Sequence, residues 1–304
     1  MQLKVILLGT ASAMPTYERG LSSTAIVRGG EVMLFDVGEG AQRNFLKSGI
    51  GTNRRMKVFI THMHSDHCVG LLGLLQTMSL QNRNMPMQLY GPEQINDFIH
   101  NNMKLLNFGF TFPITINTVS EGIVVEESDY VIKAKLANHS IKSYSYCMEE
   151  RERPGIFYPE KAKTLGIPEG NLWHKLQQGE DIEFNDKIIK SEEVTGPKRN
   201  GRKIGISGDT RPDDNLIEFF HDCDLLIFDS TYTDEHKEKA KDNMHSTARE
   251  AATLAVKSNV RKIILSHFSA RYEDINLLAK EAMEIHSNVV AAEDLLTIEV
   301  PYDQ

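Results

Sequence analysis

The sequence has few of the features that an extracellular or membrane-embedded protein needs. Only three cysteines occur in 304 residues, an odd number without a Cys-x-x-Cys pair. This argues against a disulfide scaffold and favours a reducing compartment. No apolar run approaches the roughly 20 residues that span a bilayer. The first stretch, MQLKVILLGTASAMP, lacks the layout of a signal peptide and predicts a strand over Lys4–Leu8. We therefore expect a cytoplasmic protein with no membrane partner.

Positive charge is also scarce. The chain carries 34 Lys and Arg against 42 Asp and Glu, a formal net charge of −8. Because proteins bind nucleic-acid backbones mainly by neutralising phosphates, this balance counts against such a partner. Two local clusters keep the possibility open, and they consist of Arg54, Arg55 and Lys57, and of Lys198, Arg199, Arg202 and Lys203.

The strongest chemical signal lies in residues 57–70, KVFITHMHSDHCVG. The apolar run Val58–Ile60 predicts a buried strand, and Val69–Leu80 predicts a helix. Between them, in a predicted loop, stand His62, His64, Asp66 and His67. Imidazole and carboxylate are the ligands that zinc takes in proteins. A polar turn that is rich in histidine by chance is the alternative, but four metal-competent side chains at a strand end favour a metal site.

Strands and helices are interspersed through both halves of the chain. This layout predicts an α/β fold with two mixed sheets packed face to face and helices outside, a four-layer αββα sandwich. Three residues of the second half repeat the pattern of an apolar strand followed by a metal-competent side chain. They are His139 in KLANHS, Asp209 in ISGDTR and His267 in IILSHFSARY. The remaining histidines are predicted to be surface or packing residues, except His245, which is considered below.

These residues together predict a two-metal site with Asp209 as the bridge. Two metals roughly 3.5–4 Å apart can activate a water and hold a substrate oxygen, and their residual positive charge suits a phosphodiester. Asp66 is placed to accept a proton from the water, as ligand, base or both. We expect two Zn²⁺ per subunit, although spacing alone does not separate zinc from Mn²⁺ or Fe²⁺.

The ligand series resembles the signature of the metallo-β-lactamase superfamily, a fold that hosts hydrolases of many substrates. Further stretches resemble the ribonuclease Z family, whose members remove 3′ trailers from precursor tRNA. They are LFDVGEGAQRN (34–44), ISGDTRP (206–212), NMHSTAREAA (243–252) and LSHFSARY (265–272). The resemblance extends over essentially the whole chain. It implies a single metallo-β-lactamase-type domain over residues 1–304.

The His-Ser-Thr motif at 245–247 is the part specific to that family. The resemblance implies that His245 protonates the leaving oxygen and that Asp229 orients the His245 ring. The family has a glutamate at the position of Asp229, in a His-Glu-Ala-Thr motif, where this chain has Phe228-Asp229-Ser230-Thr231. The sequence Thr247-x-x-Glu250 predicts a capping box at a helix start. A simple cap-region histidine is therefore the alternative interpretation of His245.

The resemblance also implies a protruding arm, inserted at residues 149–181, that grips the tRNA. The basic residues expected to contact substrate phosphates are Arg151, Arg153, Lys161 and Lys163 in the arm, with Arg19 and Arg271 in the body. Asn171 stands where the family's arm motif has proline, and Gly20 stands where the family often has asparagine. An ordinary surface insertion of mixed charge is the alternative to a tRNA-binding arm.

We therefore expect a zinc-dependent endoribonuclease that acts on precursor tRNA as a homodimer. The products would be a tRNA with a 3′-hydroxyl and a trailer with a 5′-phosphate. One alternative is a small-molecule phosphodiesterase or arylsulfatase of the same fold. The other is a non-catalytic RNA-binding relative, against which the complete ligand set argues.

Overall fold

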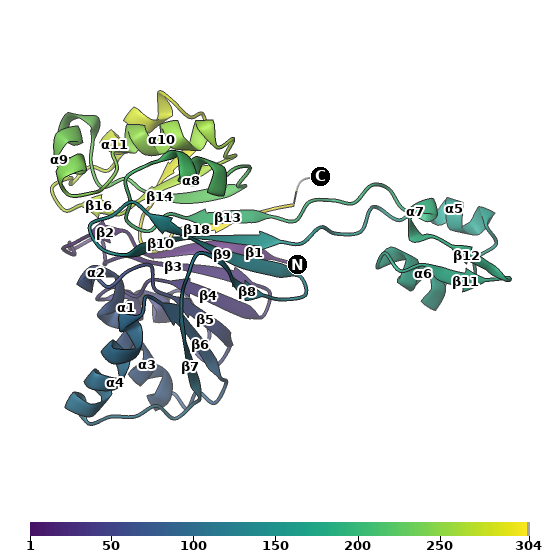
Figure 1. Ribbon diagram of the computed structural model, residues 1–304, viewed down its shortest axis with the longest axis horizontal. Helices are drawn as coiled ribbons and strands as arrows, with labels where there is room; N and C mark the ends of the chain where they lie inside the picture. Colours follow the sequence, from purple (N-terminus) through teal and green to yellow (C-terminus); the bar gives the residue numbers. More distant parts are fainter. Residues whose placement is uncertain (303–304) are drawn as a thin grey trace. The chain divides into compact units, whose positions relative to one another are not determined.

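The computed structural model describes residues 1–302. The chain divides into two compact units (Figure 1). The first consists of residues 1–126, 131–148 and 203–301, and the second, within the described residues, consists of residues 127–130, 149–202 and 302. The first unit contains all the predicted metal ligands, and each unit is described by itself below.

The first sheet of the larger unit has seven strands. Their order across the sheet is β18 (Thr297–Glu299), β1 (Leu3–Gly9), β3 (Ser23–Arg28), β4 (Glu31–Phe35), β5 (Arg55–Phe59), β6 (Met87–Gly91) and β7 (Ile114–Thr118). Neighbours from β18 to β4 pair antiparallel, and those from β4 to β7 pair parallel. The β3–β4 hairpin turns at Gly29, whose φ of 55° favours glycine.

The second sheet also has seven strands. Their order is β17 (Val289–Ala291), β15 (Ile263–Ser266), β14 (Leu225–Asp229), β13 (Lys203–Ile206), β10 (Ser143–Glu150), β9 (Tyr130–Ala137) and β8 (Gly122–Glu126). The strands β13, β14, β15 and β17 run parallel. Because parallel neighbours end at the same edge, the residues that follow β13, β14 and β15 are brought together there.

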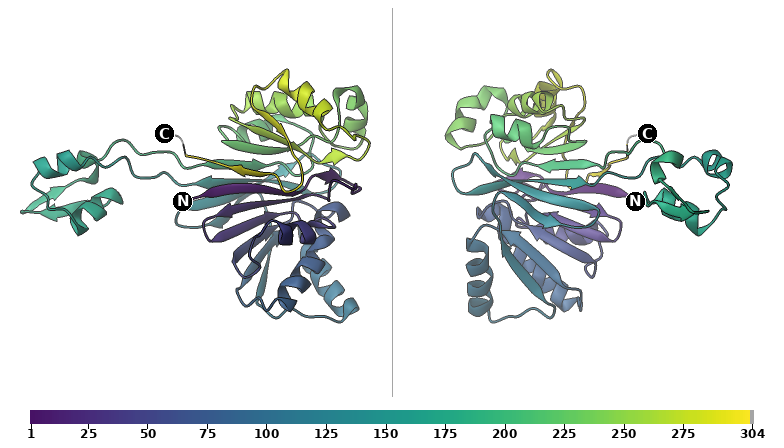
Figure 2. Two further views of the ribbon diagram at one scale, coloured as in Figure 1. Left: turned by 180° about the vertical axis from the view of Figure 1, so that it is seen from behind. Right: turned by 45° about the vertical axis from the view of Figure 1, so that its right-hand side comes forward.

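Helices cover the outer face of each sheet, and the two sheets face one another (Figure 2). The first sheet carries α1 (Ala41–Lys47), α3 (Gly70–Leu80) and α4 (Gln94–Leu106), and the second carries α8 (Asp214–Phe219), α9 (Lys237–Asp242), α10 (Ala248–Lys257) and α11 (Asn276–Met283). A short 3₁₀ helix, η1 (Asp234–His236), precedes α9. The predicted four-layer αββα sandwich is confirmed.

An aromatic cluster joins the two sheets. The ring of Phe59 in β5 stacks on that of Phe35 in β4 with centroids 4.8 Å apart, and Tyr146 of β10 lies 5.4 Å from Phe59. The Tyr146 hydroxyl is buried and donates a hydrogen bond to the Ile60 carbonyl at 3.0 Å. This contact anchors the second sheet beside the point where β5 ends and the histidine stretch begins.

That stretch differs from the prediction in one respect. Residues after Phe59 are extended only as far as His64, and Ser65–Cys68 forms a short helix, α2, rather than loop. His64, at the N-cap position with φ −64° and ψ 147°, is where the extended chain becomes helical. Asp66 and His67 therefore project from a helical turn, which fixes their directions more tightly than a loop would.

Two short strands connect neighbouring loops of the first unit. The strand β2 (Ala11–Ser12) pairs in parallel with β16 (Phe268–Ser269), which directly follows His267. The pairing brings the loop after β1 to the edge where β15 ends. No helix in the described residues is both long and apolar enough to span a bilayer.

The second unit has its own apolar core. Its elements are α5 (Pro159–Thr164), α6 (Asn171–Gln177), β11 (Ile182–Phe184), β12 (Lys187–Ile189) and α7 (Ser191–Val194). The buried core residues are Ala162, Ile167, Leu176, Ile182, Ile189 and Val194. The hairpin β11–β12 turns at Asn185 and Asp186, both with positive φ, as a two-residue turn requires. This unit therefore continues beyond residue 181 and packs around side chains from both ends of the segment.

Candidate metal centre

Four of the predicted ligands form one cluster. The Nε2 atom of His62 lies 3.1 Å from Nδ1 of His64, and Nε2 of His139 lies 3.2 Å from the same atom. The Asp209 carboxylate faces them, with Oδ2 3.5 Å from His62 Nε2 and 4.0 Å from His139 Nε2. These ligand atoms come from the end of β5, the end of β9 and the end of β13. Residues distant in sequence therefore converge on one point.

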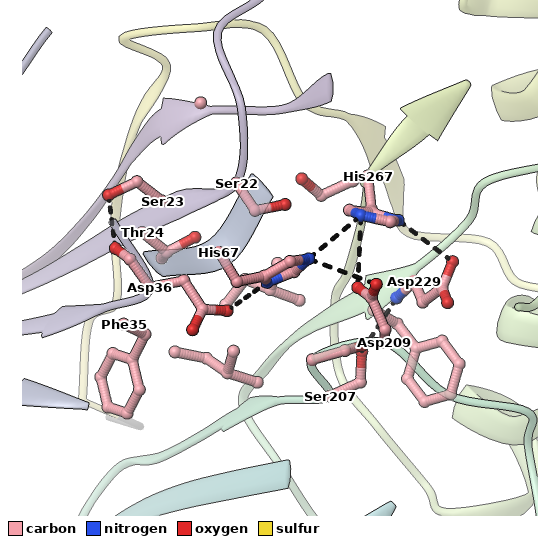
Figure 3. A pocket seen from close by; sticks show the side chains of 16 residues that line it. Ser22, Ser23, Thr24, Phe35, Asp36, His67, Ser207, Asp209, Asp229 and His267 are labelled. Atoms are coloured by element: carbon pink, nitrogen blue, oxygen red, sulfur yellow. Dashed lines mark hydrogen bonds and ion pairs between the residues drawn. The ribbon is translucent and has the colours of Figure 1, made fainter. Parts of the chain in front are cut away.

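A second cluster shares Asp209 with the first. His67 Nε2 lies 3.2 Å from Asp209 Oδ2 and 3.3 Å from His267 Nε2. Asp66 Oδ2 lies 3.6 Å from His67 Nε2 and 3.5 Å from His267 Nε2. The side chains of His67, Asp209 and His267 point toward one another (Figure 3). Asp209 therefore lies between two groups of ligands, as a bridging carboxylate would.

The donor set fits two tetrahedral metal ions. Zinc bonds of about 2.0–2.1 Å place neighbouring tetrahedral ligand atoms about 3.4 Å apart. The ligand-to-ligand distances given above lie between 3.1 and 4.0 Å, around that separation. In each cluster the ligand atoms, together with Asp209, lie within 4.8 Å of one another. His64 is half-buried and the side chains of the other ligands are buried, so the site meets solvent on the His64 side.

The protonation states also suit a bound cation. Burial and the neighbouring imidazoles lower the pKa of His62 and His64, which keeps both rings neutral as ligation requires. Burial alone would raise the pKa of the Asp66 and Asp209 carboxyls, but the facing histidines outweigh it and lower both pKa values. Burial is outweighed at His67 as well, whose pKa is raised by Asp209 and Asp36, so a cation would have to displace the proton of this ring before His67 could bind it. The buried carboxylates nevertheless supply negative charge that a cation would neutralise.

A set of outer contacts orients the histidine rings. Asp36 Oδ2 lies 2.7 Å from His67 Nδ1. Thr231 Oγ1 lies 2.8 Å from His267 Nδ1, and Nδ1 of His139 donates to the Met244 carbonyl at 3.0 Å. Such partners fix which nitrogen of each ring faces the metal.

Backbone conformation contributes to the same arrangement. Asp36 and His267 have φ values of 56° and 64°, in the left-handed region that residues other than glycine seldom adopt. Each follows the last residue of a strand and turns its side chain toward the cluster (Figure 3). A cavity of about 40 Å³ lies against Asp36, His67 and Asp209, large enough for an ordered water.

His245 stands beside the clusters in the turn before α10. Its Nδ1 lies 2.8 Å from Asp229 Oδ2, and its ring centroid lies 5.3 Å from that of His139. The predicted capping box is present, and Thr247 rather than His245 supplies its side chain to the helix. The imidazole is therefore free of a capping role, and its Nε2 is the nitrogen available to a substrate.

Close relatives identify the family. The chain is 53% identical over 298 residues to the ribonuclease Z of Nitrosopumilus maritimus, covering 98% of this chain and 100% of that protein. It is 42% identical over 301 residues to the ribonuclease Z of Methanosarcina acetivorans, covering 99% of each. This chain belongs to the ribonuclease Z family. The predictions of that family and of an enzyme are thereby confirmed.

Solved structures agree with this assignment. The short form of human tRNase Z superposes on this ribonuclease Z-family chain with a TM-score of 0.73 at 29% identity, covering 98% of this chain and 99% of that one. The metallo-β-lactamase fold protein YhfI from Bacillus subtilis, at 16% identity, gives 0.70 and covers 98% and 100%. The predicted metallo-β-lactamase fold is confirmed. A family model described as anti-Pycsar protein Apyc1 matches residues 3–145.

Two basic residues expected to contact substrate lie near the loops of the metal site. Arg19 is buried and donates from Nη2 to the Tyr272 carbonyl at 2.8 Å, while no hydrogen-bond partner within residues 1–302 reaches its Nε. Arg271 is exposed, donates to Ser269 Oγ at 3.0 Å and lies 4.9 Å from the ring centroid of Tyr232. Whether a ribonuclease Z substrate meets either residue stays a prediction.

The four basic residues predicted for the arm belong to the second unit. Arg153 lies over the ring of Tyr302 at 3.4 Å, and Lys163 pairs with Glu160 at 3.1 Å. Arg151 donates to the Glu127 carbonyl at 3.3 Å, and Lys161 lies 4.8 Å from a tyrosine ring. Their proposed phosphate contacts also stay predictions.

Cys68 and the remaining histidines belong to no metal-competent group within residues 1–302. Cys68 is a buried thiol whose pKa burial raises to about 12, so it is neutral. The five remaining histidines are His100, His174, His221, His236 and His286. Sequence reasoning missed Thr231, Met244 and the backbone N–H of Ala13, which donates to Asp66 Oδ2 at 2.8 Å. No sequence pattern marks a threonine hydroxyl or a backbone group as a partner of a ligand.

Proposed function

We propose that this protein is a zinc-dependent endoribonuclease that removes the 3′ trailer from precursor tRNA. The observation that carries the proposal is the Asp209 carboxylate shared by two ligand clusters, with the Asp229–His245 pair beside them. The names of its relatives, ribonuclease Z and tRNase Z, supply the substrate class. We assign two Zn²⁺ per subunit because the donors are imidazoles and carboxylates at tetrahedral separations.

The chain's own residues would divide the proton transfers between them. When bound, the cations would supply positive charge to the phosphate and acidify a water. Asp66, which is ionised, would accept the proton that the attacking water loses as its oxygen bonds to phosphorus. His245 would give a proton to the departing 3′-oxygen as the P–O3′ bond breaks. The tRNA would then end in a 3′-hydroxyl and the trailer would begin with a 5′-phosphate.

The second unit and a second subunit complete the proposal. We propose that residues 149–181 act as the tRNA-binding arm, with Arg151, Arg153, Lys161 and Lys163 available to phosphates. The family resemblance further implies a cytoplasmic homodimer in which the arm of one subunit holds the tRNA cut by the other. Light scattering at a mass of twice 34.3 kDa would support the dimer, and a monomer mass would refute it.

The first test is cleavage of a labelled precursor tRNA that carries a 3′ trailer, with both new ends mapped. We expect a single cut beside the discriminator nucleotide, which a chelator abolishes and zinc restores. The variant Asp66→Ala should stay folded and lose about 1,000-fold or more in kcat, because it removes a ligand and the proton acceptor together. No cut with any divalent metal would refute the proposal and favour a hydrolase of small phosphate or sulfate esters.

A further inference from the structure

An arginine links the loop that carries Asp209 to the turn that carries His245. Arg211 donates from Nη1 to the His245 carbonyl at 2.5 Å and to Glu250 Oε2 at 2.7 Å, and its Nη2 pairs with Glu250 Oε1. The side chains of Arg211 and Glu250 are only 14% and 16% exposed. This fork-to-carboxylate geometry is shielded from solvent, so the pair is stronger than an ordinary surface ion pair.

We propose that Arg211 and Glu250 form a positioning pair that holds His245 for proton donation. The inference rests on the proposed function, in which His245 protonates the departing 3′-oxygen. Neither residue is assigned a catalytic role, because Arg211 contacts the backbone of His245 and not its imidazole.

Helix capping alone does not account for the pair. Glu250 already completes the capping box, since its Oε2 accepts from the Thr247 N–H at 3.0 Å and its own N–H donates to Thr247 Oγ1 at 3.1 Å. That box would close without Arg211. The added guanidinium joins the start of α10 and the preceding turn to the loop after β13, and that loop supplies the bridging Asp209.

The turn is also held on its other side. The Met244 carbonyl accepts from His139 Nδ1, and Met244 itself has a left-handed φ of 59°. His245 thus lies between a backbone contact to a metal-site histidine and a backbone contact to Arg211. With the backbone fixed at both points, only the rotation of the His245 ring is left for the Asp229 contact to set. A proton donor needs such fixed placement, because a small displacement from the accepting oxygen slows proton transfer.

Substrates with different leaving groups distinguish a role in positioning the proton donor from a role in general structural support. A ribose 3′-oxygen leaves poorly without a proton, whereas p-nitrophenolate leaves readily without one. The variant Arg211→Met should therefore lose about 100-fold in kcat on precursor tRNA, with KM nearly unchanged, and less than about threefold on bis(p-nitrophenyl) phosphate. Arg211→Lys, which can reach only one of the two acceptors, should fall between the wild type and Arg211→Met.

Arg249→Gln is the matched control. Arg249 neighbours Glu250 in α10 and pairs with Glu284 and Asp234, but it does not contact His245. Both activities should stay at the wild-type level in this variant. Hydrogen exchange gives a readout independent of turnover, since amides of residues 243–248 should exchange faster in Arg211→Met than in Arg249→Gln, with equal metal content in both.

Two outcomes would overturn the inference. One is wild-type cleavage of precursor tRNA by Arg211→Met, and the other is an equal loss on both substrates, which would mean damage to the metal centre. If the wild-type protein leaves precursor tRNA uncut, the proposed function fails by itself. The positioning role of the pair is then tested on aryl phosphodiesters. Arg211→Met should lose more rate with a phenolate leaving group than with p-nitrophenolate. Equal losses on both esters would refute the positioning role.

Discussion

The Asp229 carboxylate is the main source of positive charge on His245, and the more distant Asp209 adds to it. Burial favours the neutral imidazole, but the Asp229 carboxylate 2.8 Å away outweighs it and raises the pKa of His245 to about 9. The ring is protonated below that pKa and loses its proton above it. If His245 is the proton donor, kcat on precursor tRNA should fall as the pH rises through about 9. Bound cations would oppose the effect of Asp229 and move this fall to lower pH.

The variant Asp229→Asn tests this dependence on pH. An amide can keep the contacts to Thr231 that Asp229 Oδ1 makes, but it cannot stabilise an imidazolium. The alkaline fall of kcat should move to lower pH by at least one unit, measured under single-turnover conditions across pH 6–10 (1 unit is about 1.4 kcal/mol). An alkaline limb at the same pH in both proteins would contradict the role given to Asp229.

Thr231 illustrates how a neutral side chain can control a metal ligand. Its Oγ1 lies 2.8 Å from His267 Nδ1 and 2.7 Å from Asp229 Oδ1, so one hydroxyl orients two residues. Thr231→Val should weaken binding of the second metal about tenfold, measured by zinc titration against a competing chelator. The control is Thr253→Val, whose hydroxyl only bonds back to the Arg249 carbonyl within α10. Equal zinc affinity in the two variants would show that Thr231 does not tune the site.

Sequence alone could predict the ligands, and Asp36 as support for a histidine ligand, but not most of the outer partners. Each ligand segment combines an apolar strand with a histidine or aspartate just after it, and that local pattern is visible without a structure. The contact between His139 and Met244 spans 105 residues and uses a backbone carbonyl, which every residue possesses. The contact from the Ala13 N–H to Asp66 likewise uses a backbone group that carries no sequence signal. Such contacts depend on how the two sheets pack against each other, and no local sequence pattern predicts that packing.

At the scale of elements, the helical turn α2 and the helix α3 that follows it position Asp66 and His67, two of the four ligands of the second cluster. Gly70 opens α3 against the loop after β4, where an added Cβ would meet the Gly38 carbonyl oxygen at 2.0 Å. The turn that carries Asp66 and His67 is therefore set by a backbone-to-backbone contact. Periodicity predicted α3 correctly from its apolar positions, yet it gave no sign that Ser65–Cys68 would be helical.

This contact makes Gly70 intolerant of a methyl group. Gly70→Ala should cost about 2 kcal/mol in the free energy of unfolding, because a backbone carbonyl cannot move aside, and should lower zinc affinity by displacing α2. Gly73→Ala in the same helix is the control, since its Cβ would meet only the flexible Gln42 side chain, at 2.8 Å. Urea denaturation and zinc titration measure the two effects. A Gly70→Ala protein as stable as Gly73→Ala would refute the tight contact.

At the scale of the whole molecule, the two compact units separate chemistry from the proposed tRNA binding. Every metal-competent group described above lies in the first unit. The second unit packs its own apolar residues, including Leu176 and Val194. Arg153 and Arg199 exchange backbone hydrogen bonds of 2.7 and 2.9 Å, so the chain closes on itself at the base of that unit.

That closure defines a clean deletion. Replacing residues 154–198 with a short glycine–serine linker removes the core of the second unit, joins two backbones that are already paired, and leaves both seven-stranded sheets complete. Because phosphate contacts supply most of the affinity for RNA, kcat/KM on precursor tRNA should fall at least about 100-fold, or about 2.7 kcal/mol. Hydrolysis of bis(p-nitrophenyl) phosphate should stay within about threefold of the wild-type rate, since the small ester needs only the metal centre.

A parallel loss of both activities would show that the first unit depends on the second. Intact tRNA cleavage would instead remove the tRNA-binding role from residues 154–181, which include Lys161 and Lys163.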